Sequence, residues 1–252
     1  MSKGKKEKVI AIIPARYAST RFEGKPLALI CGQPMIHYVY TSVAKCGVID
    51  ELYVATDDER IARVVEGFGG NVIMTSAKHP TGTDRIAEAA SKIDADIIVN
   101  VQGDEPLVKA EMVEQAVRPI LDDHNVYVTT LMSKINNAGD FVDNTIVKAV
   151  RDVNDDILFL SRAPIPYPKT RQDFVVYKQI GLYAFKKPFL MEFVKMQQTN
   201  LELIEGVEFL RILENGRKIR GVETNCSTIS VDTISDLCEV EKYLKAKAKK
   251  RG

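Results

Sequence analysis

The chain opens its first regular element with Val9-Ile10-Ala11-Ile12-Ile13, which breaks at Pro14 and continues as Ala15-Arg16-Tyr17-Ala18-Ser19-Thr20-Arg21-Phe22-Glu23-Gly24-Lys25-Pro26-Leu27. A buried strand over 9–13 therefore leads into a loop that carries Arg16, Arg21 and Lys25 among small residues. Three cationic side chains at the end of a strand indicate a binding site for a polyphosphate. The loop lacks the spacing of a Walker loop, and no G-x-G-x-x-G dinucleotide fingerprint follows the strand.

The first half of the chain alternates between two patterns. Strand-like runs at 9–13, 51–56, 71–74 and 96–101 are separated by helix-like segments at about 34–46, 58–67, 82–92 and 109–121. Apolar strands that alternate with helices predict an α/β fold, with a parallel sheet covered on both faces. Ligands of such sheets lie beyond the carboxyl ends of the strands, so we expect the site in the loops after the first and fourth strands.

From about residue 126 the pattern changes. Strand-like runs follow one another with little helix between them, at 126–132, 146–151, 157–160 and 175–185, and a Pro-rich turn lies at 163–168. We expect a second, more antiparallel layer here. Helices near 187–196 and 207–214, a strand near 217–224 and an amphipathic helix near 233–247 close the chain.

The composition is that of an ordinary globular protein. The 252 residues are 45% hydrophobic and carry a net charge of +1, so no overall field points to a nucleic acid or a membrane surface. The basic ends, 1–8 and 245–252, are interpreted as solubilising tails. The four cysteines form no C-x-x-C pair or zinc spacing, which favours a reduced, cytoplasmic setting. Neither a signal peptide nor a membrane span is expected.

Two aspartates are candidates for a metal site. Asp104 follows the fourth strand in Val99-Asn100-Val101-Gln102-Gly103-Asp104, and Asp232 precedes the last helix. Mg²⁺ prefers carboxylate oxygens and shares its other positions with phosphates and water. Either aspartate could instead cap the helix that follows it, and their pairing in space does not follow from the sequence.

Three further segments have both a functional and a structural interpretation. The turn 79–85 opens a helix, whose N–H groups could bind an anion or a base carbonyl, while Thr81 or Thr83 caps it. Arg162, at a strand edge, could clamp a substrate carboxylate or form a surface ion pair. The helix with Glu208, Phe209 and Arg211 is amphipathic, with one solvated face.

Together these motifs resemble one family, the 3-deoxy-manno-octulosonate (KDO) cytidylyltransferases, over about residues 9–244. The resemblance rests on motifs in a fixed order: 13–16 with Ser19 and Arg21, Gly24-Lys25-Pro26-Leu27, Ala55-Thr56-Asp57-Asp58, 82–88, 99–106, 161–167, Ile180-Gly181-Leu182-Tyr183-Ala184 and Val231-Asp232-Thr233. Each motif alone is moderately specific, and the order and spacing make the set strong.

The resemblance implies a three-layer, Rossmann-like nucleotidyltransferase fold in a single domain. The nucleotide-binding part would be about 8–125 and 217–247, and the acceptor and dimerisation part about 126–216. It also implies a magnesium-dependent homodimer that transfers CMP from CTP to an acidic sugar for lipopolysaccharide biosynthesis.

The resemblance also assigns roles to residues. Arg16, Lys25 and Asp104 would be catalytic, and Asp104 and Asp232 would hold magnesium. The nucleotide would be bound by Pro14, Ala15, Arg16, Ser19, Arg21, Lys25, Thr81, Gly82, Thr83, Asp84, Arg85 and Gln102. The acceptor would be bound by Arg162, Gln179, Tyr183, Glu208 and Phe209.

The chain departs from the family pattern on the acceptor side. Gln179 stands where the family typically has histidine, Phe209 where it has glutamine, and Thr145 where asparagine is usual. A buried hydroxyl without its partner costs about 1–3 kcal/mol, so the acceptor could be a different acid: a KDO analogue, an amino sugar acid or another anion. A sugar-1-phosphate nucleotidyltransferase is the rival enzyme, and a non-catalytic nucleotide-binding module is the rival outside catalysis.

Overall fold

The computed structural model describes residues 6–18, 22–170, 174–226 and 228–249. Its internal contacts divide the chain into two compact units: unit 1 is Met1–Glu114 with Ser227–Gly252, and unit 2 is Gln115–Cys226. Ser19 and Arg21, two of the predicted nucleotide ligands, lie outside the described residues. Each unit is described by itself.

Unit 1 is built on parallel strands. Their order is β6 (Ile97–Val101), β1 (Val9–Ala15), β4 (Glu51–Thr56) and β5 (Asn71–Met74). The apolar side chains of β1 and β6 are almost wholly buried, because both faces of the sheet are covered. The predicted α/β class with a mostly parallel sheet is confirmed.

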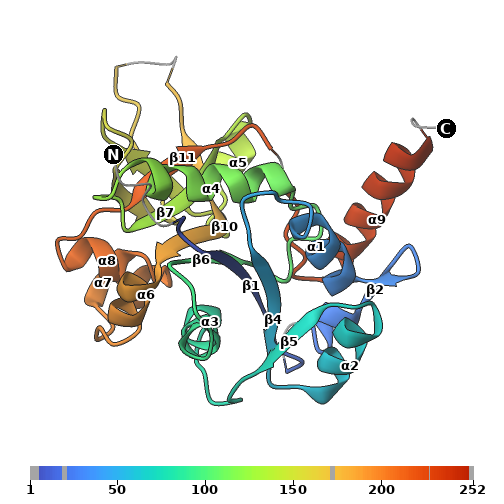
Figure 1. Cartoon of the computed structure of the whole chain (residues 1–252). Coiled ribbons are helices and arrows are strands. Elements are labelled where there is room, and N and C mark those ends of the chain that lie inside the picture. The colour runs from blue at the N-terminus through green and yellow to red at the C-terminus, as the bar shows by residue number, and fades with distance from the viewer. Residues whose placement is uncertain (1–5, 19–21, 171–173, 227, 250–252) are drawn as a thin grey trace. The chain divides into compact units, whose positions relative to one another are not determined.

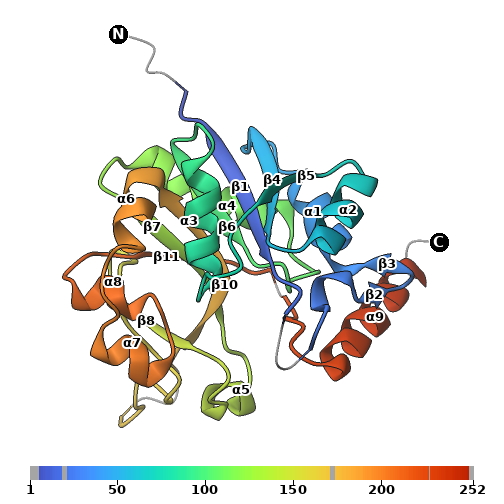
Figure 2. The ribbon, with the colours of Figure 1, turned by 90° about the horizontal axis from the view of Figure 1, so that it is seen from below.

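The helices of unit 1 lie on both sides of this sheet. Helices α1 (Met35–Val43) and α2 (Glu59–Gly67) cover one face, and α3 (Gly82–Ser91) covers the other (Figures 1 and 2). The chain steps from β1 to β4 and β5, and then returns to the other side of β1 as β6. Right-handed crossovers in opposite directions place the helices on opposite faces. The strand order therefore reverses between β1 and β6, the switch point where ligands bind in such sheets.

Short elements after β1 tie the last helix to unit 1. The one-turn helix η1 (Lys25–Leu27) leads into the hairpin β2 (Leu29–Ile30) and β3 (Gln33–Pro34), which the sequence did not predict. Helix α9 (Ile234–Lys249) runs past the predicted end at 247 and into the basic tail. A small core holds these parts together, made of Ile30, Met35, Val231 and Val240.

Unit 2 has the antiparallel-rich character that the sequence predicts. Strand β10 (Tyr177–Lys186) pairs antiparallel with both β7 (Val128–Lys134) and β8 (Lys148–Arg151), and β8 pairs antiparallel with β9 (Ile157–Ser161). Strand β11 (Arg220–Glu223) pairs parallel with β7, so it belongs to unit 2 and not to the nucleotide-binding part with which we grouped it.

The helices of unit 2 are short. They are α5 (Ala138–Val142), α6 (Lys187–Phe193), α7 (Asn200–Glu205) and α8 (Leu210–Glu214). Helix α4 (Ala110–Asp122) contains the boundary between the two units. The helix predicted over 207–214 begins only at Leu210, as α8. Helices α5 and α7 were not predicted.

Candidate nucleotide and metal site

A cavity of about 350 Å³ opens in unit 1 where β1 and β6 end. Nine of the predicted nucleotide and metal residues line it: Pro14, Ala15, Arg16, Lys25, Thr81, Gly82, Arg85, Gln102 and Asp104. Its wall also contains residues that we did not assign, namely Pro26, Met35, His79, Pro80 and Gly103. Pro26, His79, Pro80 and Gly103 lie next to predicted ligands in the segments quoted above, and this position could have identified them as lining residues. Met35 begins α1 and gave no such signal.

Gly24 shapes the chain where it enters η1. Gly24 has a φ of 67°, in the left-handed region that favours glycine, and its N–H donates to the carbonyl of Tyr17 at 2.9 Å. Pro26 follows near the start of η1 and is buried. The backbone of Lys25 is therefore held at the mouth of the cavity. The guanidinium of Arg60 stacks on the Tyr17 ring, 3.2 Å from its centroid.

The Lys25 ammonium joins the two predicted metal ligands. Its Nζ lies 2.7 Å from Oδ2 of Asp104 and 3.2 Å from Oδ1 of Asp232. All three side chains are partly buried, which strengthens their interaction relative to an exposed pair. The structure thus brings together the two aspartates that lie 128 positions apart in the sequence (232 − 104).

Backbone contacts explain why these aspartates meet. The N–H of Val231 donates to the carbonyl of Asp104 at 2.9 Å, and the Val231 side chain is buried in the small core. Asp236 then accepts from the N–H groups of Asp232 and Thr233 at 2.9 and 2.7 Å. Thr233 Oγ1 in turn accepts from the N–H of Asp236 at 3.3 Å, so Thr233, and not Asp232, caps α9, and Asp236 lies in the first turn of that helix.

The donor set suits a hard divalent cation. Two carboxylates already hold one positive charge between them, and oxygen is the ligand atom that Mg²⁺ prefers. Among the described residues, no group of three or more His, Cys, Asp or Glu side chains could hold a metal ion. A metal bound by Asp104 and Asp232 would therefore take its other ligands from phosphates and water.

The start of α3 forms the opposite wall of the cavity. The Asp84 N–H donates to Oγ1 of Thr81 at 3.2 Å, and the Thr81 hydroxyl donates to the Asp84 carboxylate at 2.7 Å. Thr83 is buried. Thr81 and Gly82 therefore line the cavity, while Thr83 and Asp84 are absent from its lining. The positive end of the helix faces this space, as suits an anion or a carbonyl.

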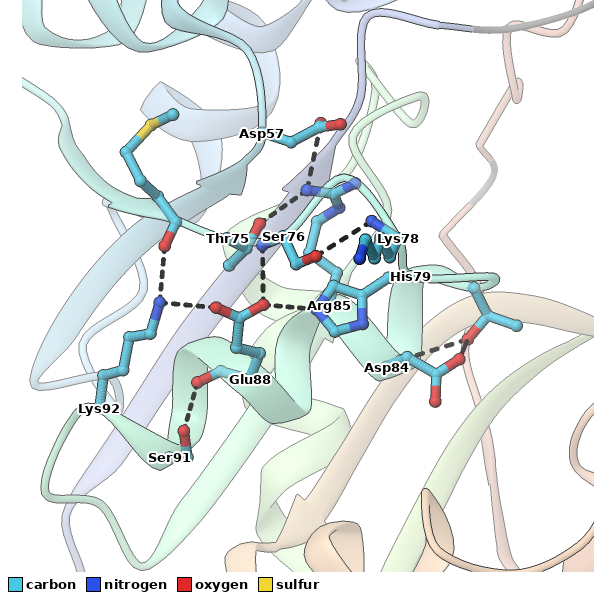
Figure 3. A network of polar contacts seen from close by, with 12 residues as sticks. Asp57, Thr75, Ser76, Lys78, His79, Asp84, Arg85, Glu88, Ser91 and Lys92 are labelled. Atoms are coloured by element: carbon cyan, nitrogen blue, oxygen red, sulfur yellow. Dashed lines mark hydrogen bonds and ion pairs between the residues drawn. The ribbon is translucent and has the colours of Figure 1, made fainter.

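A polar network holds the turn before α3 in place (Figure 3). Arg85 is buried, and its Nη1 donates to Thr75 Oγ1 at 2.6 Å and lies 3.1 Å from the Asp57 carboxylate. Glu88 contacts Nζ of Lys92 at 2.7 Å, Nε2 of His79 at 2.5 Å and the N–H of Ser76 at 2.8 Å.

These contacts, led by the hydrogen bond from Lys92, lower the pKa of Glu88 to about 2. The carboxylate is thereby kept charged, and it anchors the turn that ends in His79.

The predicted acceptor residues lie in unit 2. Gln179 is on β10 and donates to Thr130 Oγ1 at 3.2 Å. The register between β10 and β7 shifts between Ile180 and Tyr183, which re-aims the strand at Tyr183. Phe209 immediately precedes α8 and is buried against the Tyr183 ring, and Glu208 beside it is half-buried.

Arg162 is engaged with the backbone of its own unit. Its Nε donates to the carbonyl of Glu205 at 2.7 Å, and its Nη1 to the carbonyls of Asn144 and Thr145 at 3.1 Å each. The buried Lys148, which the sequence analysis missed, donates to the carbonyls of Asp143, Ile146 and Arg162 at 2.5–3.0 Å.

Arg162 and Lys148 thus both donate to carbonyls of the segment 143–146, in which Thr145 is exposed. Burial lowers the pKa of Lys148.

The cavity lies at the switch point of a parallel sheet and is lined by Arg16, Lys25 and Asp104, while Asp232 is outside its lining and reaches it through Lys25. This arrangement defines a nucleotidyltransferase of the α/β class. The cytidylyltransferase family model matches residues 10–219 of the chain. The chain therefore belongs to the cytidylyltransferase family. In the described part of the chain, no helix is long and apolar enough to cross a membrane.

The similar proteins narrow the family further. The 3-deoxy-manno-octulosonate cytidylyltransferase of Geobacter metallireducens is 50% identical over 94% of this chain and 98% of its own length. The proteins of the same name from Geobacter sulfurreducens and Syntrophus aciditrophicus are 48% and 43% identical, and cover 94% and 96% of this chain and 99% and 100% of their own. The chain is thus a member of the 3-deoxy-manno-octulosonate cytidylyltransferases.

Solved structures agree with this placement. A CMP:2-keto-3-deoxy-manno-octonic acid synthetase complexed with CTP superimposes with a TM-score of 0.92 at 37% identity, covering 96% of this chain and all of the other. A 4-diphosphocytidyl-2C-methyl-D-erythritol synthase from Anaerococcus prevotii, with a TM-score of 0.64 at 16% identity and coverage of 96% and 100%, shares the fold.

Proposed function

We propose that this protein transfers CMP from CTP to the anomeric hydroxyl of 3-deoxy-D-manno-octulosonate, giving CMP-KDO and pyrophosphate. The observation that carries the proposal is the cavity between β1 and β6, where Arg16, Lys25 and Asp104 converge. It is supported by the names of relatives up to 50% identical and by the similar structure complexed with CTP.

The reaction is an in-line displacement at the α-phosphorus. The sugar hydroxyl oxygen forms the new P–O bond, the bond between the α-phosphorus and the bridging oxygen breaks, and pyrophosphate leaves with the electron pair. The hydroxyl proton passes to solvent. Arg16 and Lys25 stabilise the charge that grows on the phosphate oxygens, so positioning and electrostatics supply the rate.

Magnesium is the cation that we assign to Asp104 and Asp232. When bound there, it neutralises phosphate charge and lowers the pKa of a coordinated hydroxyl. The residues of the chain do the rest: Arg16 and Lys25 hold the triphosphate, and the N-terminal end of α3 at Thr81 and Gly82 offers backbone donors to the nucleotide. Pro14, Ala15 and Gln102 complete this pocket, while Thr83, Asp84 and Arg85 support its wall.

The acceptor side is assigned to unit 2. Gln179, Tyr183 and Glu208 supply polar groups there, and Phe209 supports Tyr183 from behind. Arg162 holds the segment 143–146 with two of its donor groups. Because Phe209 is a buried ring where the family has a polar amide, an anionic analogue of KDO is the second candidate acceptor.

The test is pyrophosphate release from CTP with a panel of acceptors. We expect turnover with KDO and CTP in Mg²⁺, little turnover with ATP or GTP, and none with a hexose 1-phosphate. Asp104→Asn should lower kcat by at least about a hundredfold, since one carboxylate ligand is removed. Faster turnover of an amino sugar acid than of KDO would favour the second candidate, and turnover of a sugar 1-phosphate alone would overturn the proposal.

We also propose that the protein is a homodimer and that it works in the cytoplasm, where its proposed substrate CTP is made. Unit 2 offers an apolar surface around β8, where Val153 is 98% exposed and Val175 is 55% exposed. These two side chains and Pro166 line one shallow hollow of about 320 Å³. We expect the native protein to have the mass of a dimer in light scattering, and Val153→Glu to weaken it. Val142→Glu, at an exposed site on α5, is the matched control and should keep that mass.

A further inference from the structure

The Lys25 ammonium stands where a cation between Asp104 and Asp232 would stand. Its Nζ is 2.7 Å from one carboxylate and 3.2 Å from the other, and its side chain is only 16% exposed. We infer that Lys25 is a built-in counter-ion that occupies the cation position and moves to the phosphates when CTP binds, so that the divalent ion and CTP bind cooperatively. The inference rests on the proposed function and adds a positioning role to Lys25.

The exchange needs only a side-chain movement. The Lys25 backbone is fixed by the left-handed Gly24, by the hydrogen bond from the Leu27 N–H to the Gly24 carbonyl at 2.8 Å, and by the buried Pro26. Lys25 and Arg16 line the same cavity as Asp104. The flexible four-carbon stem of a lysine can therefore carry the ammonium from the carboxylates toward a phosphate in that cavity.

The backbones of the two aspartates are held by contacts that do not involve Lys25. The Val231 N–H holds the Asp104 carbonyl, and Asp236 holds the N–H of Asp232. The Asp232 side chain is 40% exposed, so an ion from solvent can reach it. Once the ammonium leaves, the two carboxylates have lost its positive charge, and a divalent cation binds to them more readily.

Cooperativity follows from the charges. In the free protein, a divalent ion must share the carboxylates with a positive ammonium, so it binds weakly. The triphosphate offers the ammonium other partners, and the vacated carboxylates then bind the ion more tightly. Because binding linkage is reciprocal, the ion must raise the affinity for CTP by the same factor.

The experiment titrates Mn²⁺ into the protein and follows the electron paramagnetic resonance signal of the free ion. It is done with and without CTP, and without any acceptor acid, so that no turnover occurs. Lys25→Met removes the competing charge, and Lys25→Gln is a second neutral variant in case one folds poorly. Lys25→Arg keeps the charge, and Lys45→Met removes an exposed lysine outside the cavity as the matched control.

We expect both neutral variants to bind Mn²⁺ alone about tenfold more tightly than the native protein. The factor by which CTP raises the affinity for Mn²⁺ should fall by about the same amount. Lys25→Arg and Lys45→Met should behave like the native protein. If the native protein binds CTP with Mn²⁺ but the neutral variants bind Mn²⁺ alone no more tightly, the exchange is wrong and the proposed function stands. If CTP does not bind to the native protein at all, both fall.

Discussion

The ring of Phe209 lies against the ring of Tyr183, with 4.3 Å between the ring centroids and 38° between the ring planes. Phe185 and Phe193 meet Phe209 edge-on from other directions, so the ring is 1% exposed. A residue that departs from the family pattern is therefore part of the core of unit 2, and it packs against Tyr183, to which we assign contact with the acceptor.

Replacing this ring with the amide of the family should destabilise the protein. Phe209→Gln removes a buried aromatic side chain and leaves amide groups among rings, so we expect a loss of about 3 kcal/mol in the free energy of unfolding. Urea denaturation measures it. Phe209→Leu keeps an apolar side chain and should lose only about 1 kcal/mol. Equal stability of the glutamine variant and the native protein would show that the amide finds partners that this packing does not offer.

Gly103, just after the end of β6, lies close to the end of β1. A Cβ on Gly103 would lie 2.9 Å from the carbonyl oxygen of Pro14, which belongs to the backbone and cannot rotate away. Gly103→Ala must therefore push the two strand ends apart on either side of the cavity. We expect a loss of about 1–3 kcal/mol in stability and a rise of at least tenfold in the KM for CTP.

Gly47 provides the control for this substitution. A Cβ there meets nothing within 4 Å, so Gly47→Ala should leave the KM for CTP unchanged. An unchanged KM in Gly103→Ala, measured by pyrophosphate release, would mean that the close approach of the strand ends does not shape the nucleotide pocket.

Local patterns in the sequence predicted most of the regular elements. The apolar run at 9–13 and the alternation that follows it identify the parallel sheet, because buried strands and amphipathic helices leave clear periods. The hairpin of β2 and β3 was missed because strands of two residues have no measurable period. Helix α7 was missed although Thr199 and Glu202 have the spacing of a capping box, which is a usable signal.

The contact among Lys25, Asp104 and Asp232 could not be predicted from local patterns. It depends on the hydrogen bond between Val231 and Asp104, which joins distant parts of the chain. Before the structure, either aspartate could have been a helix cap. Thr233 caps α9 together with Asp236, which removes that alternative for Asp232.

The network around Glu88 predicts how stability depends on pH. Its pKa is about 2 in the folded protein against an ordinary 4.5. Above about pH 4.5 the carboxylate is charged in both states, and its contacts with Lys92, His79 and Ser76 stabilise the fold in full. As the pH falls toward 2, the unfolded chain takes up a proton first and this stability is lost.

We expect this loss to be about 1 kcal/mol, because Lys92 is partly exposed and solvent screens the pair. Urea denaturation at pH 7, 5 and 3.5 measures it. Glu88→Gln should be less stable than the native protein at pH 7, with a difference that shrinks as the pH falls. Glu66→Gln removes an exposed carboxylate on α2 and should show no such convergence. A constant difference between Glu88→Gln and the native protein would contradict the assignment.

The ion pair between Arg211 and Glu202 is the most deeply buried one described in unit 2. Arg211 Nη2 and Nε lie 2.6 and 2.8 Å from the two carboxylate oxygens, and the side chains are 7% and 5% exposed. Glu202→Gln would leave the guanidinium buried without its counter-charge, so we expect a loss of about 3–5 kcal/mol in the free energy of unfolding. The exposed pair between Arg217 and Glu192 is the matched control, and Glu192→Gln should cost less than about 1 kcal/mol. Urea denaturation measures the free energy of unfolding of both variants. Similar small losses in the two variants would mean that solvent reaches the Arg211 guanidinium and replaces its partner.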